Sequence, residues 1–149
     1  MRIRTGIVPK QAEEPVMMDR EARTALILFV EYHKAFRQAA SFLMDREPDL
    51  KVVAQAGSVA EAREKMAEGG FDAALVDVPL PDEGAPEVVR DLHDANPSIP
   101  VLVLTTIEGR EVRQRFLEAG AREVLAKEIS FEDVLGAVRR LGGHGVRFR

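Results

Sequence analysis

Five short apolar runs alternate with helix-like stretches through most of this chain. The runs occupy residues 25–30, 51–56, 71–76, 101–104 and 123–126. The first, third and fourth runs are apolar throughout, a pattern typical of strands that are buried on both faces of a parallel sheet. Five strand–helix units in about 120 residues therefore predict a doubly wound α/β domain with helices on both faces of the sheet.

The stretches between the runs carry helix start and stop signals. Ser58 and Glu61 have the spacing of a capping box, and two glycines at 69–70 form a stop. Pro86 suits a first helical position, and Ser130 can cap the last helix. In the first predicted helix four apolar residues fall on one face: Phe36, Ala39, Ala40 and Leu43.

The regular pattern covers residues 24–143, which we expect to form one domain. Residues 1–23 are polar and charged without sustained periodicity, and we expect them to be an N-terminal tail, with residues 144–149 as a C-terminal tail. The chain has no Cys, which excludes disulfides and thiolate metal sites. Because no apolar run approaches the roughly 20 residues that cross a bilayer, we expect a cytoplasmic protein without membrane contacts.

Chemically active side chains follow the predicted strands. Glu31 follows the first strand, Asp77 the third, Thr105 the fourth and Lys127 the fifth. Ligands of such sheets bind at the carboxyl ends of the strands, so we expect these groups to share one crevice. The loops lack a Gly-rich phosphate cradle, which disfavours a nucleotide-binding or flavin-binding enzyme.

Four segments, taken in order, resemble the receiver domains of bacterial response regulators, especially receivers that precede a helix-turn-helix output domain. They are Leu26–His33, Asp77–Pro81, Val101–Thr106 and Ala119–Lys127. The resemblance extends from about residue 25 to residue 143. It implies a flavodoxin-like sheet of five parallel strands in the order 2-1-3-4-5, and a signalling domain in place of an enzyme.

The resemblance also implies a chemistry for the site. Asp77 would accept a phosphoryl group from a histidine kinase or phosphotransfer protein, and Thr105 and Lys127 would bind the phosphoryl oxygens. Mg²⁺ would be held by Glu31, Asp77 and the backbone carbonyl of Pro79, because a few oxygen ligands suffice for this ion. We expect a receiver that stands alone, without an output domain, and that signals to a downstream partner protein.

Several positions depart from the receiver pattern. Tyr32 replaces the second acid of the family, and a phenol is a poor substitute for a carboxylate ligand at neutral pH, so Mg²⁺ binding should be weak. The other departures are Ala85, Thr106, Val124 and Glu128. They leave open an atypical receiver that acts as a phosphorylation-independent interaction module. Glu31 could also serve only as the ion-pair partner of Lys127.

Charge bears on the expected partners. The net charge of −4 argues against nucleic-acid binding, which usually requires a basic patch. Arg110, Arg113 and Arg115 indicate either a solvated helix face or a docking patch for an acidic partner. We also expect weak homodimerisation through exposed helical faces, with the first and last helices as one candidate pair and the fourth helix with the fifth strand as the other.

Overall fold

Five parallel strands form a single sheet in the order β2-β1-β3-β4-β5, which confirms the predicted architecture. The computed structural model describes residues 24–82, 84–107, 109–128 and 130–143, and both predicted tails lie outside these ranges. The strands are β1 (Ala25–Val30), β2 (Leu50–Ala56), β3 (Ala73–Val78), β4 (Val101–Thr105) and β5 (Glu123–Ala126).

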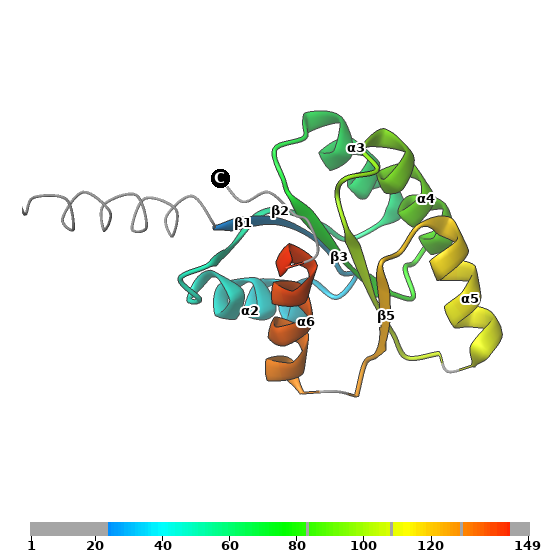
Figure 1. Cartoon of the computed structure of the whole chain (residues 1–149). Coiled ribbons are helices and arrows are strands. Elements are labelled where there is room, and N and C mark those ends of the chain that lie inside the picture. Colours follow the sequence, from blue (N-terminus) through cyan, green and yellow to red (C-terminus); the bar gives the residue numbers. More distant parts are fainter. Residues whose placement is uncertain (1–23, 83, 108, 129, 144–149) are drawn as a thin grey trace, which may run out of the picture.

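Helices cover both faces of this sheet (Figure 1). They are α2 (Lys34–Asp45), α3 (Val59–Glu68), α4 (Ala85–Ala95), α5 (Arg110–Ala119) and α6 (Phe131–Gly143). Figure 1 shows α2 and α6 on one face and α3, α4 and α5 on the other. In the part of the chain that the structure describes, no helix has the length and apolar character needed to span a membrane.

Two apolar cores explain why the central strands are apolar throughout. Successive side chains of a strand point to opposite faces of its sheet. Leu28 of β1 therefore packs with the α3–α5 side of the domain, whereas its neighbour Phe29 packs with Met44 of α2 and Leu141 of α6. A strand with a core on each side has no face left for polar residues.

Strand β3 begins at Ala73 and ends at Val78, two residues later than the sequence pattern predicts at both ends. The carboxylate of Asp72 accepts a hydrogen bond from the backbone N–H of Leu26 at 3.0 Å. The residue before β3 thus anchors the start of β1 through its side chain. As a consequence Asp77 lies inside β3, as its penultimate residue, and not after the strand.

The apolar face predicted for the first helix is mostly exposed. Helix α2 buries Ala40, Ser41 and Met44, whereas Phe36 and Leu43 point to solvent. The periodicity identified a helix correctly, but the bulkiest apolar residues are not the ones that α2 packs against the sheet.

The N-terminus of α3 is closed by side chains from two segments. Ser58 Oγ accepts the N–H of Glu61 at 3.1 Å, which confirms the predicted cap. Asp82, from the loop after β3, accepts the N–H groups of Val59 and Ala60 at 3.0 and 3.3 Å. Since the first N–H groups of a helix have no partner within it, this contact fastens the β3–α4 loop to α3.

Candidate functional site

Strand pairing brings the predicted site residues to one edge of the sheet. In the β3–β4 register Asp77 lies beside Leu104, and Val78 lies beside Thr105. The backbone N–H of Lys127, directly after β5, donates to the carbonyl of Thr105 at 2.9 Å. The carboxyl ends of β3, β4 and β5 are therefore level with one another, as expected for a parallel sheet.

An ion-pair cluster forms the centre of the site. Lys127 Nζ lies 2.8 Å from Asp77 Oδ1 and 3.9 Å from Glu31 Oε1. The side chain of Asp77 has 0% of its surface exposed, while that of Lys127 has 26% exposed. Lys127 thus reaches in from the surface to two buried carboxyl groups, and the expected pairing of Glu31 with Lys127 is present as the longer of the two contacts.

The two carboxyl groups keep unused acceptor positions. Oε1 of Glu31 and both carboxyl oxygens of Asp77 are buried and accept no hydrogen bond from the described residues. The contact between Lys127 and Asp77 is therefore an ion pair by distance without hydrogen-bond geometry. Buried carboxyl oxygens without hydrogen-bond partners destabilise the fold, because their lost hydrogen bonds to water are not replaced.

Burial and the close approach of the two acids shift their pKa values in opposite directions. Burial, followed by the neighbouring Glu31 carboxyl, raises the pKa of Asp77 to about 8 against the opposing effect of Lys127. Burial also opposes ionisation of Glu31, but contacts with Asp77, His33 and Lys127 outweigh it and lower the pKa of Glu31. Two adjacent buried carboxyl groups do not both ionise readily, and one cation balances one negative charge.

Two residues that the sequence did not assign to the site hold Glu31 in place. His33 donates its backbone N–H to Glu31 Oε2 at 2.8 Å, and its ring Nδ1 lies 3.2 Å from the same oxygen. Arg37 donates from Nη1 to the backbone carbonyl of Glu31 at 2.6 Å. Arg37 also passes close to Gly57, where an added Cβ would lie 2.7 Å from Arg37 Nη1 and would require the guanidinium to shift.

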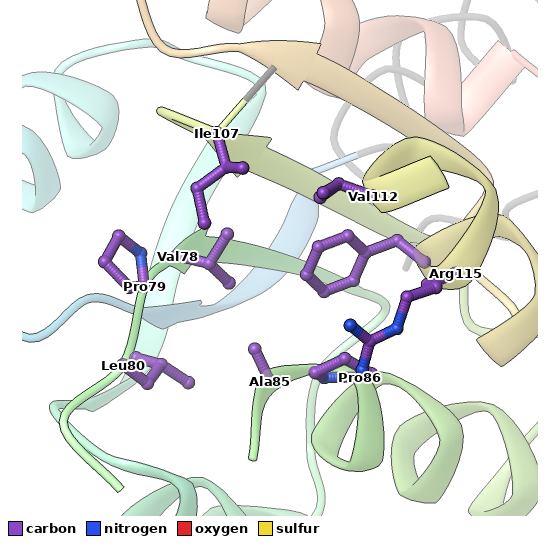
Figure 2. A pocket seen from close by; sticks show the side chains of 9 residues that line it. Val78, Pro79, Leu80, Ala85, Pro86, Ile107, Val112 and Arg115 are labelled. Atoms are coloured by element: carbon purple, nitrogen blue, oxygen red, sulfur yellow. The ribbon is translucent and has the colours of Figure 1, made fainter. Parts of the chain in front are cut away.

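Thr105 lies buried at the end of β4, and its hydroxyl has a local partner. Its buried hydroxyl oxygen accepts the N–H of Ile107 at 3.0 Å, so it closes a local turn after β4. Its binding of a phosphoryl group remains a prediction. Pro79 directly follows β3 and is exposed, with its ring at the edge of the neighbouring apolar pocket (Figure 2).

The residues at the departures from the receiver pattern have different surroundings. Tyr32 has 51% of its surface exposed, and its ring meets that of His33 edge-on with 5.2 Å between centroids. Val124 is buried within the core. Phe36, Thr106, Glu128 and Lys127 line an open hollow of about 380 Å³, which gives solvent access to the ammonium group.

The donor set fits Mg²⁺ through two carboxyl groups. Among the described residues, no three His, Asp or Glu side chains converge to form a metal site. The three oxygens of Glu31 and Asp77 that accept no hydrogen bond are nevertheless the hard ligands that Mg²⁺ takes, and this ion is commonly bound by one or two carboxylates and several waters.

Comparison with known proteins places this chain in a family. The family model of the response regulator receiver domain matches residues 27–139 of this chain. The chain therefore belongs to this family. It is 34% identical to the DNA-binding transcriptional activator DevR/DosR of Mycobacterium tuberculosis, over 78% of this chain and 54% of that protein. The response regulator protein VraR of Staphylococcus aureus is also 34% identical, over 78% and 56% of the two chains.

A solved structure supports the same assignment. The two-component response regulator of the LuxR family from Aurantimonas sp. superposes with a TM-score of 0.76 and 26% identity, covering 83% of this chain and 88% of that one. The present chain spans about half the length of the curated relatives named above. It is a response regulator receiver domain of two-component signalling, and receiver domains interact with histidine kinases.

Proposed function

We propose that Asp77 is the phosphoacceptor of this receiver domain and takes its phosphoryl group from a phosphohistidine on a partner kinase or phosphotransfer protein. The observation that carries this proposal is the position of Lys127 Nζ, 2.8 Å from Asp77 Oδ1. A half-buried ammonium beside an acid whose carboxyl oxygens accept no hydrogen bond supplies positive charge where a phosphoryl group would bring negative charge. The downstream signal would then pass to a partner protein.

The reaction is a transfer between two nucleophiles. A carboxylate oxygen of Asp77 attacks phosphorus, the bond from phosphorus to the histidine nitrogen breaks, and its electron pair returns to the imidazole. An acyl phosphate forms on Asp77 while neutral histidine leaves with a proton from solvent. Such transfers depend on positioning and on charge neutralisation, which Lys127 provides, and Thr105 would contribute its hydroxyl once it releases Ile107.

Mg²⁺ would be held by Glu31, Asp77 and the carbonyl of Pro79. When bound, it supplies positive charge to the phosphoryl oxygens. Glu31 would be the best positioned of these ligands, because hydrogen bonds from His33 and Arg37 hold its side chain and its backbone in place. With only two carboxylates, the site should bind the ion weakly.

Two observations favour a second candidate, a receiver that works as a protein-interaction module without phosphorylation. Asp77 has no exposed side-chain surface, and Tyr32 points away to solvent in the place of an acid. In such a domain Lys127, Glu31 and Asp77 would only stabilise the fold. This alternative predicts that the site takes no phosphate under any condition.

Phosphorylation by a small donor distinguishes the two candidates. The whole chain is incubated with acetyl phosphate and MgCl₂, or with EDTA, and its intact mass is recorded. We expect one added phosphoryl group with Mg²⁺, less with EDTA, and slower addition for Lys127→Met and Thr105→Ala. Lys65→Met, which removes a surface ammonium on α3, is the matched control. An unchanged mass at saturating donor would refute the phosphoacceptor role and support the interaction module.

A further inference from the structure

An apolar pocket opens beside the site, between α4 and α5 (Figure 2). Its volume is about 230 Å³, and its walls are formed mainly by apolar side chains from the end of β3, the loop after it and the two helices. They include Val78, Leu80, Ala85, Val112 and Phe116. The pocket contains no part of Asp77, Glu31 or Lys127, so it is separate from the ion-pair cluster.

The mouth of the pocket presents one bulky apolar side chain and one charge. Ile107 has 50% of its surface exposed and lines the pocket together with apolar side chains of α4 and α5, so it extends the apolar wall out to solvent. In Figure 2 the side chain of Arg115 extends from α5 toward Pro86 on α4. The side chain of Arg115 makes no hydrogen bond or ion pair with another residue in the described ranges.

We propose that this pocket binds a short acidic segment of a partner protein, which inserts one large apolar side chain between α4 and α5 and places a carboxylate on Arg115. The proposal concerns a second contact surface and goes beyond phosphate acceptance at Asp77. An apolar wall beside the unpaired guanidinium of Arg115 favours a ligand in which a large apolar side chain and a carboxylate lie side by side. Arginine is suited to the carboxylate, because its guanidinium can donate two parallel hydrogen bonds.

The size of the pocket favours a peptide side chain over a free small molecule. Ligand and cofactor sites usually have volumes of roughly 300–1,000 Å³, and this pocket is smaller. A single anchor side chain in a pocket, surrounded by weaker contacts, is the usual form of a binding hot spot between proteins.

A second copy of the chain is a poorer occupant. An anchor from another face of the same domain would create a head-to-tail contact, which propagates into open assemblies unless it closes into a ring. Phe42 is the most exposed of the large apolar residues described, but the nearby acid on its helix, Asp45, already accepts the backbone N–H of Val52 at 2.7 Å.

Synthetic peptides test the proposal directly. Four capped hexapeptides carry Leu, Ile, Met or Phe at the centre between Asp and Glu. Matched sets replace the acids by Asn and Gln, or the central residue by Ser. Each peptide is titrated into the whole chain labelled at its methyl groups, and NMR shifts are followed. We expect saturable shifts at Val78, Leu80 and Val112 with at least one acidic peptide, none with the Ser set, and several-fold weaker binding of the neutral set.

Variants separate the charge from the pocket. Arg115→Gln should weaken binding of the acidic peptide up to about fivefold, the range of an exposed ion pair, and should leave the neutral peptide unaffected. Ala85→Leu should abolish binding of the peptides by filling the pocket. If Ala85→Leu does not fold, Ile107→Ser replaces it, and this change at the mouth of the pocket should weaken binding of the peptides. Arg90→Gln, an exposed arginine of α4 outside the pocket, is the control and should bind like the wild type.

Three results would overturn the proposal. The first is the absence of saturable shifts with all four acidic peptides. The second is equal affinity for acidic and neutral peptides, which would remove the role of Arg115. The third is a concentration-dependent shift of the same methyl groups without any peptide, which would assign the pocket to a second copy. Phosphorylation of Asp77 is measured separately, so failure here leaves the proposed function standing.

Discussion

Lys127 Nζ and Asp77 Oδ1 lie 2.8 Å apart although their strands, β5 and β3, are separated by β4. The long lysine side chain crosses the end of β4 to reach an acid whose carboxyl oxygens accept no hydrogen bond from the described residues. Glu31, on the other side of β3, lies 3.9 Å from the same ammonium. Three strand ends are thus joined by one positive charge, which makes Lys127 important for stability as well as for chemistry.

Removal of that charge should destabilise the fold. Lys127→Met leaves two buried carboxyl groups facing each other, and we expect the free energy of unfolding at pH 7 to fall by about 3 kcal/mol, the lower range for breaking a buried pair. Asp77→Asn removes one of the acids and should raise stability by about 1 kcal/mol, since a buried group no longer has to lose its hydration when charged. Urea unfolding of both single variants provides the values.

The double variant Lys127→Met/Asp77→Asn tests whether these residues act as a pair. Residues in contact have non-additive effects, so the loss in the double variant should be smaller than the sum of the two single effects predicts. Additive effects would mean that Lys127 stabilises the domain by some route other than its contact with Asp77.

Tyr32 is expected to limit Mg²⁺ affinity. Tyr32→Asp adds a carboxylate next to Glu31, and a charge-assisted contact of about 1–3 kcal/mol corresponds to roughly tenfold to a hundredfold tighter binding. Without metal the variant should be less stable, because the added charge has no partner. Calorimetric titration with MgCl₂ measures the affinity. Tyr32→Phe is the control and should match the wild type, while equal affinity of wild type and Tyr32→Asp would show that another feature limits the site.

Acid pH should weaken a contact between α6 and the segment before β2. The hydrogen bond from Arg139, at 2.8 Å, lowers the pKa of Asp49. Because the pKa of Asp49 is lower in the folded state, ionised Asp49 stabilises the fold at pH values above its unfolded-state pKa of about 4. This contribution disappears as the pH falls through the pKa of Asp49 in the folded state. Asp49→Asn should therefore reduce stability by at most about 1 kcal/mol at pH 7, because the pair is exposed. The difference from wild type should vanish once the pH is below the lowered pKa of Asp49 in the folded state. A constant difference at all pH values would contradict this.

Weak self-association is expected through the exposed apolar face of α2. Phe42 is 64% exposed, and Phe36 and Leu43 are also exposed on this helix. An interface below about 800 Å² per partner would give a dimer only at high concentration. Sedimentation equilibrium should show a concentration-dependent mass that Phe42→Glu abolishes. Val53→Glu adds the same charge at an exposed position of β2 and should retain the dimer; a monomer at every wild-type concentration would contradict the expectation.

The sequence predicted the sheet well because strands buried on both faces leave little choice of pattern. The core of α2 was harder to predict, since Phe36 and Met44 both fit a helical period and only tertiary packing decides which is buried. Similarly, Arg37 was not predicted to support Glu31, because its contact is with a backbone carbonyl that no side-chain motif marks. The clustering of Glu31, Asp77 and Lys127 was predictable from their places near strand ends alone.

Mapping of the phosphorylated residue tests the phosphoacceptor role most directly. The whole chain is phosphorylated with acetyl phosphate and Mg²⁺, treated with borohydride to reduce any acyl phosphate to the stable alcohol, digested and sequenced by mass spectrometry. We predict modification at Asp77 alone, and none in Asp77→Asn carried through the same steps. Modification at another carboxylate, or an unmodified Asp77 at saturating donor and Mg²⁺, would contradict the assignment.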